Sequence, residues 1–272
     1  MNAYGPRPPA AAPRGLDVGA SEPTPLLRLV QVELRKAVDT LASFWLVAAI
    51  AILIIIVEGG LLLIVLIEGS ESSAGDYAFF ASYITAVVLP VLAIMLVTSE
   101  WTQRTAMVTF SLEPRRSRVL LAKYLTGIVL TLVAVVTAVV IGLACALICQ
   151  VVQSEQTSFD LGGAFLGGFL VTQVLAMSLG FAIACLLLNT PASIVVFVAY
   201  RVIPVSVFAV LAANFETFAD IRPWIDFEFA QGPLYDLSLS GIEWGHLLTS
   251  GALWLGIPLT LGVLRILRAE VK

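Results

Sequence analysis

The chain has 272 residues, of which 59% are hydrophobic and only 12% are charged. Soluble globular proteins carry about 25% charged residues, so this composition excludes a water-soluble protein and places most of the chain in lipid. The formal net charge of −4 argues weakly against nucleic acid as a partner, because nucleic-acid-binding domains are usually basic.

Residues 1–24 form a first segment of distinct composition, rich in proline and alanine. No apolar core precedes a cleavage site, so the segment is interpreted as a disordered tail and not as a secretory signal peptide. Residues 25–272 are then expected to form a single membrane domain.

Residues 25–43 are predicted to form an amphipathic helix, with Thr24 as N-cap and Pro25 at the first helical position. The apolar face consists of Leu27, Val30, Leu34, Ala37, Val38 and Leu41, and the polar face of Arg28, Gln31, Arg35, Lys36 and Asp39. Such a helix is expected to lie flat at a membrane interface. It would serve either as a lipid anchor alone or also as a docking surface for a cytosolic partner.

Six apolar segments are long enough to cross a bilayer, whose hydrocarbon core of about 30 Å needs roughly 20 helical residues. All must be helical, because lipid offers no partner to backbone N–H and C=O groups. The predicted spans are 44–67, 80–98, 124–148, 164–188, 193–213 and 245–264. The expected fold class is therefore all-α, a polytopic membrane protein with six transmembrane helices.

The basic residues are concentrated on one side of these spans. Of the 15 Lys and Arg residues, 13 lie before the first span, between the second and third, or after the sixth. The loop 214–244, on the other side, has six acidic residues against Arg222 alone. Because Lys and Arg are retained on the cytoplasmic side, both termini are expected to be cytoplasmic.

Glu58 and Arg201 are ionisable residues inside predicted spans. A charge at mid-span costs about 2.5–3.5 kcal/mol on insertion scales, so neither is expected to face lipid alone. At about 1.5 Å per residue, Glu58 lies about 21 Å along the first span and Arg201 about 12 Å along the fifth. A long Arg side chain covers this offset, so we predict an intramembrane ion pair. The alternative is that Glu58-Gly59-Gly60 interrupts the first span.

Residues 99–123 separate the second and third spans and are too many for a tight turn. Residues 99–111 are predicted to form a short helix, with Ser99 as candidate cap and Glu100 in the first turn. Glu113-Pro114 is expected to end it. Arg115, Arg116 and Arg118 follow. Attraction to anionic headgroups, about 1 kcal/mol per residue, explains these cations but not the helix.

Three further patterns bear on packing. Cys145, Cys149 and Cys185 lie inside apolar runs without a CxxC motif, so they are interpreted as packing residues and not as a metal site. Gly163 and Gly167 give the fourth span a small-residue face that permits close approach. The acidic and aromatic loop 214–244 is expected to form short interfacial or re-entrant helices.

This order of elements resembles the permease subunit of ABC transporters of the type-2 exporter class, over residues 25–272. Family members carry a Glu, a Gly-Thr, an apolar helix, a Pro, a basic residue and a Lys that opens the third span. The matching positions are Glu100, Thr105, Pro114, Arg118 and Lys123, while Arg104 replaces the family's Gly. The QRT and EPRR sequences look like those of actinobacterial permeases.

The resemblance implies a coupling helix at about 99–111 that sits in a groove on a separate ABC ATPase subunit. The residues implied for this contact are Glu100, Trp101, Gln103, Arg104 and Thr105. The sequence contains no GxxxxGK[ST] motif, so ATP and Mg²⁺ are expected on the partner, and this chain is expected to bind no cofactor and to be no enzyme.

The resemblance also implies a second permease chain, identical or different, facing this one in a bacterial plasma membrane. A stand-alone secondary transporter and a membrane scaffold without an ATPase remain as alternatives. A secondary transporter would usually show inverted repeats and several intramembrane acids, whereas Glu58 is the one acid identified within the spans.

Overall fold

The computed structural model describes residues 24–39, 41–153 and 157–268, and these are almost entirely helical. The predicted tail, residues 1–24, lies outside the described residues except for Thr24. Within the described ranges, six helical segments are long and apolar enough to cross a membrane. The prediction of an all-α, six-span, multi-pass membrane protein is confirmed.

The six spans coincide with the predicted ones, and all except α6 extend beyond them at both ends. They are α2 (Leu41–Glu68), α3 (Ala74–Thr102), α5 (Arg116–Gln153), α6 (Gly163–Leu187), α7 (Thr190–Asn214) and a sixth made of α10 (Gly241–Gly251), a π-helical turn (Ala252–Gly256) and α11 (Ile257–Arg268). The helices are longer because the length of an apolar run reflects the thickness of the lipid, whereas a helix continues until a cap or a turn ends it.

Two caps illustrate how the sequence sets these ends. Ser73 and Asp76 form a reciprocal capping box at the start of α3, with the Asp76 N–H donating to Ser73 Oγ over 3.1 Å. Asn189 caps α7 by accepting from the Ala192 N–H over 2.9 Å. The cap at Asn189 directly follows Leu188, whose φ of 52° ends α6, so the link between the two spans is very short.

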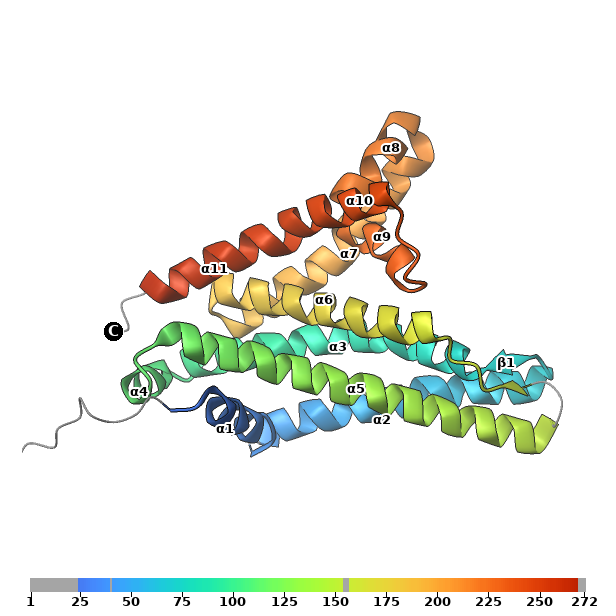
Figure 1. The fold of residues 1–272 in the computed structure, drawn as a ribbon, viewed down its shortest axis with the longest axis horizontal. Coiled ribbons are helices and arrows are strands. Elements are labelled where there is room, and N and C mark those ends of the chain that lie inside the picture. Colours follow the sequence, from blue (N-terminus) through green and yellow to red (C-terminus); the bar gives the residue numbers. More distant parts are fainter. Residues whose placement is uncertain (1–23, 40, 154–156, 269–272) are drawn as a thin grey trace, which may run out of the picture.

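The centre of the bundle is the contact between α3 and α6, which are the most deeply buried spans, whereas α7 is mostly exposed. Gly180 of α6 lies against the backbone of Pro90 in α3, where an added Cβ would be 2.5 Å from the Pro90 carbonyl oxygen. Figure 1 shows α2, α3, α5 and α6 side by side, with α7 and α11 diverging from them toward α8 (Glu216–Ile225).

The amphipathic helix predicted over 25–43 is α1 (Leu26–Asp39). Of its predicted apolar face, Val30 and Ala37 are buried against the bundle, whereas Leu27 and Val38 are exposed on the protein surface. The buried stripe also includes Glu33, which the apolar pattern did not place on either face.

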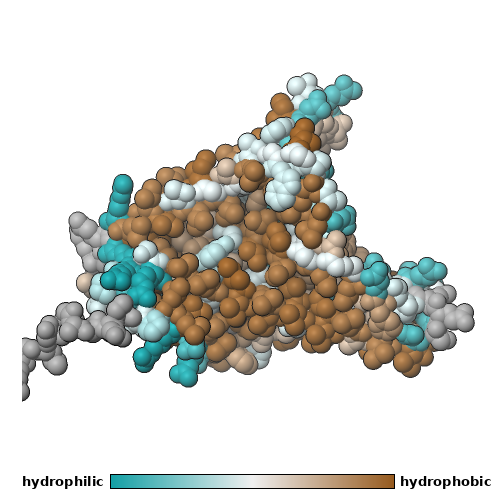
Figure 2. All heavy atoms as spheres, in the orientation of Figure 1, coloured by the Kyte–Doolittle hydropathy of each residue, from teal (hydrophilic) through white to brown (hydrophobic). Residues whose placement is uncertain are grey.

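The basic segments meet at one end of the bundle, where α1, α4 (Ala106–Leu112) and the end of α11 lie together (Figure 1). Arg118 donates to the Thr24 carbonyl oxygen over 2.5 Å, and Arg116 to the Ile266 carbonyl oxygen over 2.8 Å. Figure 2 shows hydrophilic atoms at this end, separated by a broad hydrophobic band from those at the other. This arrangement agrees with the segregation of charge along the sequence.

At the opposite end, β1 (Ser72–Ser73) and β2 (Thr157–Ser158) pair in parallel and join two interhelical loops. The loop 214–244 forms α8, α9 (Phe227–Ala230) and a 3₁₀ turn, η2 (Gly232–Leu234), so the prediction of short helices is confirmed. We refer to residues 227–237 as the hook. The hook packs on the glycines of α6, since a Cβ at Gly168 would overlap the Leu234 carbonyl oxygen.

We predict that Gly168→Ala destabilises the protein by about 1–3 kcal/mol, because the added methyl group forces the hook backbone away from α6. Gly163→Ala is the matched control, since nothing lies within 4 Å of a Cβ at that position. It should be neutral or stabilising by up to about 1 kcal/mol through helix propensity. Thermal unfolding of the purified protein measures both, and equal midpoints would contradict the packing described.

Candidate functional site

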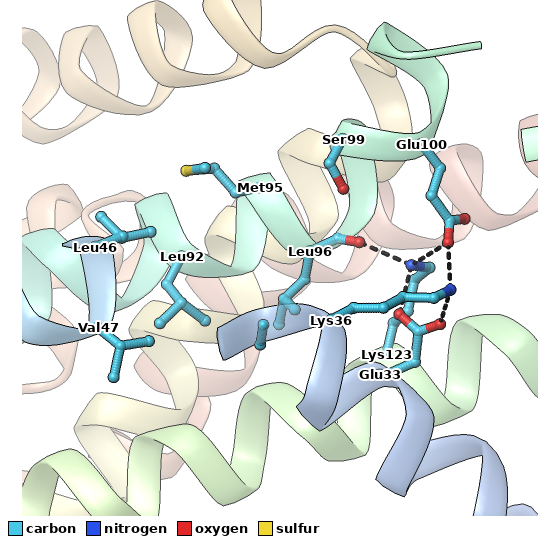
Figure 3. A pocket seen from close by; sticks show the side chains of 11 residues that line it. Glu33, Lys36, Leu46, Val47, Leu92, Met95, Leu96, Ser99, Glu100 and Lys123 are labelled. Atoms are coloured by element: carbon cyan, nitrogen blue, oxygen red, sulfur yellow. Dashed lines mark hydrogen bonds and ion pairs between the residues drawn. The ribbon is translucent and has the colours of Figure 1, made fainter. Parts of the chain in front are cut away.

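Four charged side chains from three helices meet at the basic end of the bundle (Figure 3). Glu33 and Lys36 come from α1, Glu100 from the last turn of α3, and Lys123 from the first third of α5. The Lys123 ammonium lies 2.7 Å from Glu33 Oε2 and 3.3 Å from Glu100 Oε1. Lys36 Nζ closes the ring, 2.7 Å from Glu33 Oε1 and 2.8 Å from Glu100 Oε1. We call these four residues the ion cluster.

Lys123 is the most buried member, with 4% of its surface exposed. A lysine ammonium has three N–H donors and no acceptor. Lys123 has three acceptors around it, because it also donates to the Leu96 carbonyl oxygen over 2.9 Å. Its hydrogen-bonding capacity is thus satisfied entirely by α1 and α3.

The charges of the ion cluster cancel, with two carboxylates and two ammonium groups. Burying paired charges is close to neutral for stability, but removing one partner leaves a charge without compensation and costs about 3–5 kcal/mol. The main effect of the ion cluster is therefore to select one arrangement of α1, α3 and α5, and its net contribution to the free energy of unfolding is small.

Lys36 closes the ion cluster on its solvent side, with 44% of its side chain exposed. Burial alone would lower the pKa of Lys36, but its hydrogen bonds to Glu100 and Glu33 have the larger combined effect. The pKa of Lys36 therefore lies above its ordinary value, and this residue stays charged across the physiological range.

The helix predicted over 99–111 is wrong in its boundaries. The α3 helix continues from the span through Thr102, a turn follows at Gln103 and Arg104, and α4 begins at Ala106. Residues 99–102 therefore belong to the second span, and the separate helix has only seven residues. The expected stop is confirmed, since α4 ends at Leu112 and Glu113 is extended.

The turn is a Schellman motif, which is closed by two backbone hydrogen bonds. The Thr105 N–H donates to the Glu100 carbonyl over 2.8 Å, and the Arg104 N–H to the Trp101 carbonyl over 3.2 Å. The motif requires a left-handed residue after the helix, usually glycine. Arg104 occupies that position with φ 56°, so the turn forms here without the glycine.

The α4 helix folds back on the end of α3. The ring of Phe110 lies 6.1 Å from that of Trp101, and the Arg116 guanidinium lies 5.1 Å over Phe110. These contacts leave two apolar residues of α4 on the outside, Met107 and Val108, which are 56% and 60% exposed. The turn and α4 thus present a small, mixed polar and apolar surface.

The five residues implied for an ATPase contact separate into two groups. Gln103, Arg104 and Thr105 are exposed on the turn. Glu100 is 8% exposed and faces the ion cluster, and Trp101 is half-buried against Phe110. Glu100 and Trp101 therefore hold the turn in place and do not form its outer surface.

The predicted pair of Glu58 with Arg201 does not form. Arg201 instead makes an ion pair with Glu228 of the hook. Glu58 is fully buried in α2, and neither carboxylate oxygen has a hydrogen-bond partner among the described residues. The alternative is also wrong, because α2 is continuous from Leu41 to Glu68. Similar depth along two spans does not bring their side chains together unless the spans are neighbours. Here α2 packs mainly against α3 and α5, whereas α7 packs mainly against α3, α6 and α8.

Glu33 is the member of the ion cluster that the sequence analysis missed. The available signal was its position in α1, between Val30 and Ala37 on what became the buried stripe. A charged residue at such a position indicates a buried partner, because an unpaired charge there would be costly.

No protein-family model matches this chain, and no curated protein matches its sequence. The fold and the hydropathy define a class, the multi-pass membrane proteins. Among the described residues, no group of His, Cys, Asp and Glu could hold a metal ion.

We predict that Lys123→Met destabilises the protein by about 3–5 kcal/mol, because it leaves Glu33 and Glu100 buried with only Lys36 as partner. Lys36→Met makes the same chemical change at a half-exposed position and should cost about 1 kcal/mol or less. Thermal unfolding at neutral pH checks both variants. Equal destabilisation by the two would show that burial of Lys123 is not what matters.

Proposed function

We propose that this chain is the membrane-spanning permease subunit of an ATP-driven exporter, coupled to a separate ABC ATPase subunit. The proposal rests on the resemblance of residues 25–272 to type-2 exporter permeases and on the six-span fold. The basic end of the bundle is assigned to the cytoplasm, because Lys and Arg are retained there. Both termini, α1 and the turn after α3 would then face the cytoplasm of a bacterial cell.

One observation supports the coupling role above the others: the Schellman turn falls at the position where the resembling family carries glycine. Arg104 has the left-handed conformation that glycine favours, so the local backbone agrees with the motif although the residue differs. The revised contact surface comprises Gln103, Arg104, Met107 and Val108, which are all exposed.

The ion cluster gives this surface a mechanical connection to the spans. Glu100 is within one turn of Arg104, and its carboxylate contacts Lys36 of α1 and Lys123 of α5. A push on the turn would therefore move the ends of α1, α3 and α5 together. ATP and Mg²⁺ would be bound by the ATPase, a second permease chain would complete the pathway, and this chain would perform no covalent chemistry.

Copurification with an ABC ATPase subunit tests the proposal. Arg104→Glu reverses a charge at the centre of the contact surface and should weaken ATPase binding at least tenfold. Arg35→Glu is the matched control, an equally exposed arginine on α1 that the proposal places outside the contact, and it should leave binding within about twofold. Each variant is first checked for unchanged thermal stability.

Two results would contradict this function. In one, no ATPase associates with the wild-type chain, which would favour a secondary transporter or a scaffold. In the other, Arg104→Glu and Arg35→Glu reduce binding equally, which would indicate general charge attraction in place of a defined contact.

A further inference from the structure

A polar cavity of about 190 Å³ lies away from the ion cluster, where the hook reaches α3, α6 and α7, and it opens at the exposed Tyr83. Its polar lining comprises Tyr83, Thr172, Gln173, Arg201, Glu228, Gln231 and Tyr235. Cavities for drug-sized ligands measure roughly 300–1,000 Å³. This one is smaller, and its volume is of the order needed for one small ring such as a monosaccharide.

Gln173 provides an acceptor that the protein does not use. Its side chain is 0% exposed, its Nε2 donates to the Ser82 carbonyl oxygen over 3.3 Å, and its Oε1 has no partner among the described residues. Exchanging the two amide atoms would place two carbonyl oxygens against each other, so the Ser82 carbonyl fixes the orientation. A buried amide oxygen without a donor is unusual in folded proteins, and it indicates a missing donor in the cavity.

Arg201 and Glu228 contribute opposite charges that cancel. Asp226 holds the start of α9 by accepting from the Phe229 N–H over 3.1 Å, and Arg222 in turn holds Asp226 at 3.0 Å. The start of the hook is therefore held by Asp226 and Arg222, which lie just before it in the chain. Because the ion pair is neutral overall, the cavity has no reason to select a cation or an anion.

Tyr235 supplies an aromatic wall. Its ring stacks on Phe165 with centroids 6.2 Å apart and planes at 23°. Its hydroxyl lies 3.5 Å from Ser82 Oγ, and Ser82 donates its own proton to the Phe79 carbonyl over 2.6 Å. The Tyr235 hydroxyl is therefore the donor in this pair, which fixes the ring at the side of the cavity.

We infer that this cavity binds a neutral polyhydroxyl group, either a free sugar or the sugar headgroup of a lipid. A hydroxyl can donate and accept at once, so vicinal hydroxyls can donate to Gln173 Oε1 and Glu228 while accepting from Arg201. The C–H face of a sugar ring can then lie against Tyr235. Binding here requires no ATPase, so the inference is independent of the proposed function.

The test uses the full chain in phosphatidylcholine nanodiscs, because glucoside and maltoside detergents would compete for the cavity. Methyl β-D-glucoside is titrated against the thermal unfolding midpoint, since a ligand that binds only the folded state raises it. A parallel arm replaces part of the lipid with monoglucosyl diacylglycerol. Methylammonium chloride is the cationic comparison probe, because the lipid headgroups would compete with choline.

Gln173→Met keeps the volume and removes the acceptor, and it should weaken binding at least tenfold. Thr131→Val is the control, since Thr131 is fully buried in α5 and bonded to the Gly127 carbonyl oxygen, outside the cavity. It should leave binding within twofold. Glu228→Gln keeps an oxygen facing Arg201 and should weaken binding severalfold. This variant replaces Gln173→Met in the test if Gln173→Met does not fold.

Saturable binding of either glucoside that depends on Gln173 or Glu228 supports the inference, and binding of one glucoside alone identifies the source of the sugar. Three results would overturn it: no saturable binding of either glucoside by the wild type, equal affinity in the wild type and the cavity variants, or tighter binding of methylammonium than of the glucosides.

Discussion

A single buried ammonium group organises one end of this protein. Lys123 is enclosed by a carboxylate from α1, a carboxylate from the end of α3 and a backbone carbonyl of α3. Because an ammonium group cannot be left unpaired in an apolar interior, α1 has to lie against the bundle with Glu33 inward. The end of α3 has to place Glu100 within reach, and this sets where the following turn begins.

At the opposite end of the bundle, the hook is held against α6 by close contact between their backbones and not by buried charges. The hook reaches into the bundle because Gly168 leaves room for the Leu234 carbonyl and for the Tyr235 Cα, 2.7 Å from where a Cβ would be. Of the two glycines predicted to permit close helix packing, Gly167 lies against Leu237 of the hook and not against a helix, and nothing lies within 4 Å of a Cβ at Gly163. The contact between the hook and α6 brings Glu228 to Arg201 and forms the cavity lined by Gln173.

The six spans could be predicted from the sequence, because a run of apolar residues reports directly on the lipid it must cross. The stop at Glu113-Pro114 followed from the local backbone restriction at proline. The Schellman turn at Arg104 could not be predicted from the sequence, since the left-handed residue of this motif is normally glycine. The partners of Arg201 and Glu100 were also missed, and the pair predicted for Glu58 does not form, because depth along a span does not report which spans are neighbours. Glu33 was overlooked because α1 was expected to contact lipid with its apolar face, and packing of a charged residue of α1 against the bundle was not considered.

The position of α1 on the bundle depends on Glu33 and Lys123 acting as one unit. A double-mutant cycle measures this coupling directly, using reversible unfolding of the wild type, Glu33→Met, Lys123→Met and the combined variant. We expect the combined variant to lose at least about 2 kcal/mol less than the sum of the two single losses, as contacting residues in one network do. Losses that add to within about 0.5 kcal/mol would show that the two residues act independently, and would contradict the central role given to the ion cluster.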